Sequence, residues 1–306
     1  MTIGSHLTTF AGLPIVAWDA GDDPADPAAV AWRAEVTDFE APPSEFEEAF
    51  ERVLARAGDG GPVALVLGEW GSAYEEAAPL DLLVRNAGRL GALRSLFIGE
   101  MTFEQCEISW IQHGDITPLL EAFPRLERLW LRGTEGLELK PLRHPALTEL
   151  VVQSGGLPPA LARTVLECDL PALTHLELWL GVEAYGGVAT PDDLEPLLSD
   201  RVLPALTRLG LCNAENTDAL AAALAASPLV PRLSELDLSK GTLGDAGAEA
   251  LLAGQPLGHL RALDVSHHFL SAEVAQRLVD ALPGVRVDVS EACTEERWGR
   301  YTTVAE

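Results

Sequence analysis

The sequence has few cysteines and no long hydrophobic run. Its four cysteines lie far apart and form no CxxC or Cys/His spacing, which argues against a disulfide framework and against a zinc knuckle. No stretch of about 18 apolar residues is present, so we expect no membrane span. The opening segment MTIGSHLTTFAGLPIV lacks the basic and apolar regions of a signal peptide. Together these absences predict a cytoplasmic protein in a reducing compartment.

Positive charge is also scarce. Lysine and arginine number 21 against 47 aspartates and glutamates, which gives a formal net charge of −26. A chain this acidic repels phosphate groups, so we expect neither nucleic acid nor a membrane surface as a partner. Solubility alone, or an acid-rich proteome, would explain the same charge.

The motifs of common catalytic sites are missing as well. The sequence has no GxxxxGK[ST] phosphate loop, no GxGxxG after a strand and no GxSxG turn. Asp264 with the neighbouring pair His267 and His268 has residue types that bind metals. Because neighbouring side chains of an extended chain point opposite ways, we expect no metal, no cofactor and no catalytic residue here. A metal-dependent or hydrolytic enzyme at these three residues stays open as the alternative.

The sequence does contain a repeated leucine pattern. Nine segments fit or approximate L-x-x-L-x-L, among them LERLWL from Leu126 and LSELDL from Leu233. Alternating leucines predict half-buried strands, and their recurrence predicts a repeat architecture. The interval from Leu129 to Leu150 is too short for a helix, so we expect extended chain or a turn there. The residues at the fourth position of the nine segments are Leu65, Leu96, Leu129, Leu150, Leu176, Leu209, Leu236, Leu263 and Val287.

Helices are predicted between most of these strands. Ser271 is the expected N-cap of the helix in SAEVAQRLVDAL, Thr190 that of the helix in TPDDLEPLLSD, and Thr217 begins an alanine-rich helix. Upstream of the repeats, Ser44 and Glu47 have the spacing of a capping box at the start of SEFEEAFERVLARAG.

The L-x-x-L-x-L series resembles the leucine-rich repeat, and GDAGAEALLAG after Leu243 is similar to the long-repeat, ribonuclease-inhibitor-like subclass. The chain also resembles a group of actinobacterial leucine-rich-repeat proteins that keep a similar EISWI insert. The resemblance implies an α/β fold, a right-handed solenoid with a curved parallel sheet on its concave side and mostly helices on its convex side. None of the nine residues at the ninth position is Asn or Cys, unlike the family, and this predicts irregular curvature.

Three segments divide the predicted chain. Residues 1–60 lack the repeat and are predicted to form a small α+β cap over the first exposed core. Residues 61–290 are predicted to form the solenoid of about nine strands. Residues 291–306 are predicted to cap the other end through Trp298 and Tyr301.

Strand geometry turns the repeats into a predicted binding surface. Successive side chains face opposite ways, so the third, fifth and seventh positions form columns on the concave face when the leucines face the core. The fifth position is apolar in the first four strands and mostly acidic in the last five. Tryptophan and arginine often dominate binding energy. The predicted binding residues are Phe97, Arg128, Trp130, Arg132 and Trp179, with Glu177, Asp237 and Asp264 at the acidic end.

These columns predict a non-catalytic scaffold that binds a protein or peptide with apolar and basic groups. Two alternatives stay open. The N-terminal segment or the insert Gly99–Asp115, which we expect to form a hairpin, could cover Phe97, Trp130 and Val151 as core. Alternatively, Trp130 between two arginines could be a cation–π pair worth roughly 0.5–2 kcal/mol, with no ligand.

Overall fold

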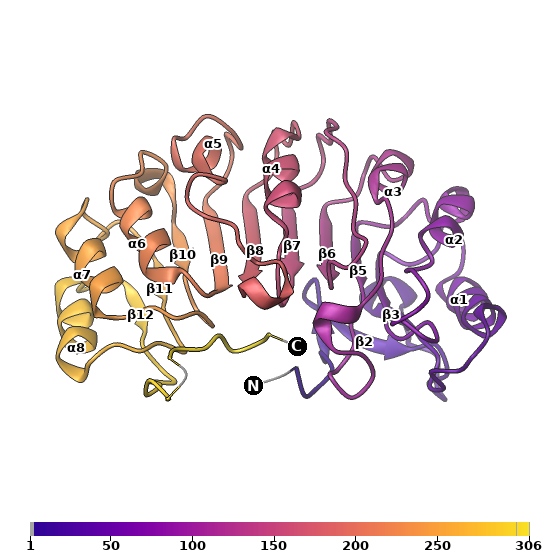
Figure 1. The fold of residues 1–306 in the computed structure, drawn as a ribbon. Helices are drawn as coiled ribbons and strands as arrows, with labels where there is room; N and C mark the ends of the chain where they lie inside the picture. The colour runs from indigo at the N-terminus through magenta and orange to yellow at the C-terminus, as the bar shows by residue number, and fades with distance from the viewer. Residues whose placement is uncertain (1–2, 298, 306) are drawn as a thin grey trace. The chain divides into compact units, whose positions relative to one another are not determined.

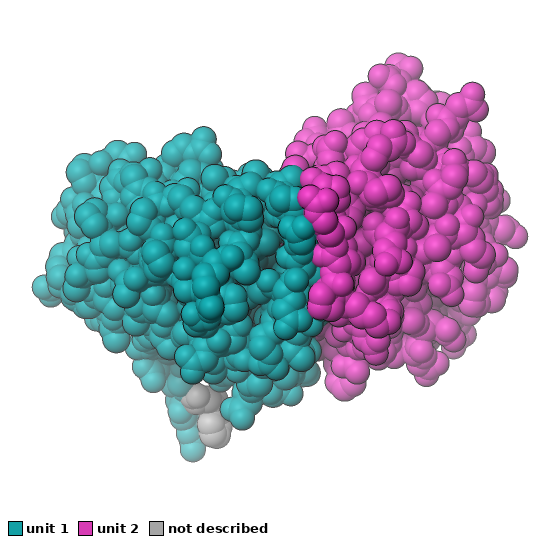
Figure 2. All heavy atoms as spheres, turned by 90° about the horizontal axis from the view of Figure 1, so that it is seen from above, with its two compact units in different colours: residues 1, 154–305 teal, residues 2–153, 306 magenta. Residues whose placement is uncertain are grey.

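The computed structural model describes residues 3–297 and 299–305. Its contacts divide the chain into two compact units, which Figure 2 shows in different colours. Residues 3–153 are named the N-terminal unit and residues 154–305 the C-terminal unit. Each unit combines α-helices with mostly parallel strands, which confirms the α/β class, and in neither unit do the described strands close into a barrel.

In the N-terminal unit each strand pairs with the next in chain order, β1 with β2 antiparallel and the others parallel. Figure 1 shows helices α1 to α3 along one side of these strands. The elements are β1 (Thr9–Phe10), β2 (Leu13–Ala17), η1 (Pro27–Ala29), β3 (Ala31–Ala34), α1 (Pro43–Ala57), β4 (Ala64–Leu67), α2 (Leu80–Arg85), η2 (Ala87–Arg89), β5 (Ser95–Ile98), η3 (Ile108–Trp110), α3 (Thr117–Ala122), β6 (Arg128–Arg132) and β7 (Glu149–Gln153).

In the C-terminal unit strands and helices alternate, and β8 to β12 pair in chain order, all parallel. The elements are α4 (Pro159–Glu167), β8 (His175–Gly181), η4 (Glu183–Tyr185), α5 (Glu195–Leu198), β9 (Arg208–Ala214), α6 (Thr217–Ala225), η5 (Val230–Arg232), β10 (Glu235–Asp237), α7 (Asp245–Ala253), β11 (Ala262–Asp264), α8 (Ala272–Ala281) and β12 (Arg286–Asp288).

The nine predicted strands are confirmed, and so is their register within each unit. In the N-terminal unit Leu65 is the register partner of Leu96, Leu96 is that of Leu129, and Leu129 is that of Leu150. In the C-terminal unit the corresponding partners are Leu176, Leu209, Leu236, Leu263 and Val287. The register places equivalent side chains of neighbouring strands side by side, so the columns read from the sequence exist in each unit.

The sheet of the N-terminal unit extends into the segment that lacks the repeat. Strand β2 pairs in parallel with β3, and β3 pairs in parallel with β4. Trp32 is the register partner of Leu65 and is fully buried. An aromatic side chain therefore fills the position that leucine fills in the repeats, so this strand continues the register outside the leucine pattern.

Helix starts agree with the sequence in part. The Ser271 side chain caps α8 by accepting a hydrogen bond from the Val274 amide, and α6 begins at Thr217, both as predicted. The capping box at Ser44 is wrong: α1 begins at Pro43 without a side-chain cap, since proline at the first turn needs no amide partner. The prediction at Thr190 is also wrong, because Thr190 donates to the Asp193 carboxylate in a turn and α5 begins only at Glu195.

The insert Gly99–Asp115 does not form the expected hairpin. It turns through the short η3 helix and is held at its end by the amide of His113, which donates to the carbonyl of Glu135. The His113 ring is buried, and its Nε2 donates to the carbonyl of Arg132 at 2.8 Å. The insert is thus fixed to the loop after β6.

The C-terminal tail runs back along the strand ends of its own unit (Figure 1). The Tyr301 ring packs edge-on against His267, the Thr303 amide donates to the carbonyl of Lys240, and the Val304 amide donates to the side chain of Asn213. The tail therefore contacts the loop after β11, the loop after β10 and the end of β9 in turn. Trp298, the other residue predicted to form the cap, lies outside the described residues.

Within the described part of the chain, every helix is too short or too polar to cross a membrane.

Replacing Phe10 tests whether the N-terminal segment belongs to the core. Its ring lies 5.8 Å from that of Phe97 and 5.5 Å from that of Trp130, and it is buried. We expect Phe10→Ala to lower the free energy of unfolding by about 3–5 kcal/mol in urea titrations. Phe103→Ala, at an exposed phenylalanine, is the control and should change it by less than about 0.5 kcal/mol. Equal effects of the two changes would contradict the assignment.

His113 predicts a pH dependence of stability. Burial lowers its pKa from 6.5 to about 4, and its hydrogen bond to the Arg132 carbonyl offsets this only in part. On acidification, His113 is protonated near pH 6.5 in the unfolded chain but only near pH 4 in the folded chain. Protonation therefore favours the unfolded chain, and the free energy of unfolding falls as the pH decreases from about 6.5 to about 4. The loss should be on the order of 3 kcal/mol, and His113→Gln should remove that component. Unfolding curves of both proteins across the window decide this, and identical pH slopes would count against it.

Candidate functional site

Side chains alternate between the two faces of the sheet as the leucine spacing predicts. Leu236 is buried, while Glu235 and Asp237 on either side of it are partly exposed. Leu129 and Leu131 are likewise buried around the half-buried Trp130. We name the face that carries the third, fifth and seventh positions the inner face, and all eight predicted binding residues lie at such positions.

In the N-terminal unit the apolar columns of the inner face are covered. Phe97 is fully buried in a cluster with Phe10, Ala31, Ala64 and Val66. Partly buried residues of the N-terminal segment and Trp130 pack against it: Leu7, Ala11, Leu13, Ile15 and Trp130. Phe97 is therefore a core residue and offers no surface to a partner, which corrects its prediction as an anchor. The chain itself supplies the cover, as one of the two alternatives expected.

A buried carboxylate holds this N-terminal segment in place. Glu100 is fully buried; it accepts a hydrogen bond from the Leu7 amide at 2.9 Å and lies 2.9 Å from Nδ1 of His6. Arg33 pairs with the same carboxylate from strand β3. A buried charge is tolerated only when it is paired and hydrogen-bonded, and these three contacts meet that condition.

Trp130 and Arg128 retain partial exposure and share one partner. The indole Nε1 of Trp130 donates to the Glu149 carboxylate at 2.7 Å, and Nε of Arg128 lies 3.4 Å from its other oxygen. The Trp130 ring also meets Phe10 and Phe97 edge-on. The cation–π pair left open as an alternative for Trp130 is thus replaced by a hydrogen bond from its indole to a carboxylate on the next strand.

Arg132 is a buried structural residue. It is 3% exposed; its Nε donates to the Gln153 side chain at 2.8 Å and its Nη1 to the carbonyl of Met101 at 2.5 Å. Burial lowers the pKa of Arg132 to about 10, with the charge of Glu100 acting against that shift. Its guanidinium ties the insert to β6 and β7, so the prediction of a surface anchor is corrected here too.

The C-terminal unit keeps an open, charged inner face. A pocket of about 210 Å³ lies on strands β8 to β12, and its lining includes the three predicted acidic residues Glu177, Asp237 and Asp264. Its other charged or polar lining residues are His175, Arg208, Glu235 and Arg286. These four residues also lie at third positions of the repeats, but the predicted binding residues did not include them.

Gly210 forms the hollow of this pocket. It stands in the fifth-position column between Glu177 and Asp237, its register partners on β8 and β10. A Cβ at this position would lie 2.8 Å from Cγ of Glu177 and 3.2 Å from Sγ of Cys212. Any side chain would therefore displace Glu177 or fill the pocket. In the sequence, the pocket was indicated only by a glycine in a column whose other members in this unit are carboxylates.

Trp179 supports the pocket from below its surface. It is buried, its Nε1 donates to Glu177 at 2.7 Å, and Nζ of Lys240 lies 5.6 Å from its ring centre. Burial opposes ionisation of Glu177, but hydrogen bonds from His175 and Trp179 outweigh it and lower the Glu177 pKa. Trp179 thus positions a charged carboxylate and does not itself present a binding surface.

The aspartates of the column form a repeated turn. Asp237, Asp264 and Asp288 each accept a hydrogen bond from the amide of the serine two residues later, at 2.8 to 2.9 Å. Burial raises the pKa of Asp237, and the negative charges of Asp264 and Glu177 add to it, while the bonds from Ser239 oppose it. One oxygen of each carboxylate is occupied by its turn, and the column gathers negative charge that a cation would neutralise.

The Asp264, His267 and His268 group is not a convergent set. The His267 ring lies 3.1 Å from the carbonyl of Gly241, and the His268 ring contacts the carbonyl of Val289 at 2.9 Å and the amide of Leu270 at 3.1 Å. Both rings are buried, whereas Asp264 lines the inner-face pocket. Within residues 3–297 and 299–305, no cluster of three or more His, Cys, Asp or Glu side chains could hold a metal ion.

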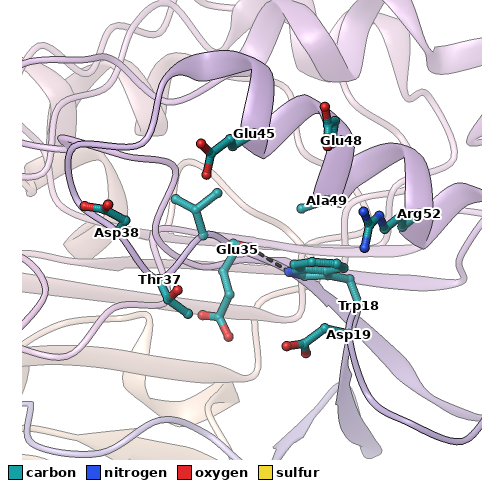
Figure 3. A pocket seen from close by; sticks show the side chains of 10 residues that line it. Trp18, Asp19, Glu35, Thr37, Asp38, Glu45, Glu48, Ala49 and Arg52 are labelled. Atoms are coloured by element: carbon teal, nitrogen blue, oxygen red, sulfur yellow. Dashed lines mark hydrogen bonds between the residues drawn. The ribbon is translucent and has the colours of Figure 1, made fainter.

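A second pocket lies beside α1 in the N-terminal unit (Figure 3) and was not predicted. Its volume is about 560 Å³, and its walls include the indole of Trp18 beneath the Arg52 guanidinium, which lies 4.9 Å from the ring centre. Burial raises the pKa of Glu35 in its wall, against the charge of Arg33. The lining carboxylates are Asp19, Glu35, Asp38, Glu45 and Glu48. They favour cationic over anionic groups.

Comparison with known proteins places the chain in a family. Neither a family model nor a curated protein matches the sequence. A solved structure from Bacteroides fragilis, a target of the Northeast Structural Genomics Consortium, matches with 31% identity and a TM-score of 0.78, over 88% of this chain and 77% of that chain. The chain belongs to the family of that protein. The description of the Bacteroides fragilis relative gives a source and no activity, so the relative supports the α/β fold.

Two arginines of β6 provide a matched test of the corrected roles. Arg132→Ala removes a buried guanidinium and leaves Gln153, Glu100 and a backbone carbonyl without its charge, so we expect a loss of about 3 kcal/mol or more in unfolding free energy. Arg128→Ala removes a partly exposed ion pair on the same strand and should cost about 0–1 kcal/mol. Urea unfolding measures both. A smaller loss for Arg132→Ala than for Arg128→Ala would reverse the assignment.

Proposed function

We propose that the protein is a non-catalytic scaffold of the leucine-rich-repeat type, and that it binds a protein or peptide segment on the inner face of strands β8 to β12. The in-register L-x-x-L-x-L strands with helices between them support the solenoid assignment. The observation that carries the binding proposal is the open pocket around Gly210 of β9, whose lining carboxylates come from β8 on one side and from β10 and β11 on the other.

The ligand chemistry follows from this lining. Glu177, Asp237 and Asp264 bring three carboxylates to one column, and their mutual repulsion is relieved when a cation binds between them. Arg286 at a third position of the same lining offers donors to backbone carbonyls or carboxylates of a ligand. A polypeptide with basic side chains meets both requirements, and so we favour it over a small anion.

The apolar part of the proposed ligand has less room than the sequence indicated. In the N-terminal unit Phe10 already occupies the inner face over Phe97. The inner face of the C-terminal unit is therefore the proposed binding surface, with Glu177, Asp237 and Asp264 as its specificity-determining residues.

Peptide selection tests this function. A displayed library of random peptides is selected against the wild-type protein at about physiological ionic strength, where surface attractions are screened. We expect enrichment of peptides with arginine or lysine, and roughly tenfold or greater weakening of their affinity by Asp237→Asn/Asp264→Asn.

Asp192→Asn/Glu273→Gln is the matched control, since it removes two exposed acidic charges elsewhere in the same unit. It should change the affinity by less than about twofold, within the range expected for remote surface charges. Equal binding to all three proteins would exclude the inner-face pocket as the binding site.

A further inference from the structure

Two loops of the N-terminal unit join to form a rigid platform: residues 69–79 after β4, and the insert 99–115 after β5. The Gln112 amide donates to the carbonyl of Ala73 at 2.9 Å, and the Ala78 amide donates to the carbonyl of Gln112 at 3.0 Å. The Glu107 amide lies 3.4 Å from the hydroxyl of Tyr74, which accepts from it. The insert is therefore bonded to the first loop at both its turn and its end.

The interior of the platform is apolar. Cys106, Ile108 and Ile111 of the insert are buried, as is Trp70 of the first loop, whose Nε1 donates to the carbonyl of Glu76 at 2.9 Å. Buried anchors spaced along an insert fix its conformation, so its exposed side chains are held before any partner arrives.

The exposed side of the platform is aromatic. Trp110 is 47% exposed and Tyr74 is 43% exposed, and both adjoin the Glu107 turn, since the Trp110 amide donates to the carbonyl of Glu107. Phe103 of the same insert is 40% exposed. Among residues 3–297, Trp110 is the one tryptophan whose side chain is exposed, whereas the others are buried or partly buried. Large aromatic side chains left in water are costly unless a partner covers them.

The charged side chains of these two loops are all acidic. Neither residues 69–79 nor residues 99–115 contain a lysine or arginine, and Glu75, Glu76 and Glu104 of the loops are exposed. The nearby cations are engaged elsewhere. Arg132 is buried, Lys140 pairs with Asp115 at 2.7 Å, and Arg85, which lines a pocket with Glu76, pairs with Glu47 of α1 at 3.3 Å.

Elsewhere the chain covers its aromatic rings with its own arginines. The guanidinium of Arg52 lies 4.9 Å from the centre of the Trp18 ring, and that of Arg56 lies 5.0 Å from the centre of the Trp32 ring. Among the described residues, no cation stacks on Trp110 or Tyr74 in this way. The platform therefore has the aromatic rings and carboxylates that an arginine side chain binds, but no arginine of its own.

We propose that this platform docks an arginine-bearing segment of a partner protein, with guanidinium groups stacked on Trp110 and Tyr74 and paired with Glu75, Glu76 and Glu104. Arginine fits better than lysine because its planar guanidinium stacks on an aromatic face and bonds a carboxylate through two donors. Carboxylates around the rings repel phosphate, which disfavours nucleic acid and anionic lipid as occupants. The proposal uses residues separate from those of the inner-face pocket.

A defined peptide tests the proposal. The probe is a dye-labelled peptide of alternating arginine and glycine, and fluorescence anisotropy follows its binding to the full chain at about 0.15 M salt. We expect Trp110→Ala and Tyr74→Ala each to weaken binding by roughly tenfold, with Trp110→Phe intermediate. The matching lysine–glycine peptide should bind the wild type less tightly than the arginine peptide does. Trp110→Ala should bind the two peptides with about the same affinity.

Two controls separate this surface from the overall negative charge and from the proposed function. Because the proposed inner-face pocket also favours basic peptides, all of these variants are made in an Asp237→Asn/Asp264→Asn background, which removes two carboxylates from that pocket. In that background Glu45→Gln/Glu48→Gln removes two carboxylates of α1 and should change affinity by less than about twofold, because it does not touch the platform. Circular dichroism checks that every variant is folded.

The proposal is overturned if, in that background, Trp110→Ala binds the arginine peptide as tightly as the parent protein, or if Glu45→Gln/Glu48→Gln weakens binding as much as Trp110→Ala does. It is also overturned if sedimentation shows a dimer that Trp110→Ala dissociates, because a second copy of the chain would then be the occupant.

Discussion

The fold and the proposed site both depend on the alternation of side chains along in-register parallel strands. Leucine at the fourth and sixth positions places the odd positions on the opposite face, and parallel pairing places equivalent positions of neighbouring strands side by side. In the C-terminal unit this register brings Glu177, Asp237 and Asp264 into one column with Gly210 between the first two. A slip of one residue in any strand would move its carboxylate into the apolar interior.

The same geometry produces opposite surfaces in the two units because the fifth position changes character. In the N-terminal unit Val66 and Phe97 are apolar, and leaving them in water would be unfavourable, so a segment with Phe10 covers them. In the C-terminal unit Glu177, Asp237 and Asp264 make the column acidic and stay partly exposed, so no such cover is required. Glu100, which binds His6, Leu7 and Arg33, adds a directional contact that the apolar cluster alone would not provide.

The sequence predicted what is local and repeated. The leucine spacing gave all nine strands and their register within each unit, because alternation over a few residues is enough to identify a half-buried strand. It left the burial of Phe97 as an open alternative and did not predict that of Arg132, because their covering groups, Phe10 and the insert, are distant in sequence and follow no repeat. The pocket beside Trp18 escaped for the same reason: its walls come from α1 and from the strand region before it. The predicted caps at Ser44 and Thr190 failed where a neighbouring proline or aspartate provided another way to begin the helix or turn.

Thiol labelling along β10 tests the alternation most directly. Single changes Leu236→Cys, Asp237→Cys and Leu238→Cys are made in a Cys293→Ser background, since the other three cysteines of the chain are buried. Under native conditions we expect the thiol at position 237 to react with a soluble maleimide at least about 100-fold faster than those at 236 and 238, which react only after local opening. Faster labelling at 236 and 238 than at 237 would show that the leucines face the solvent and would contradict the account.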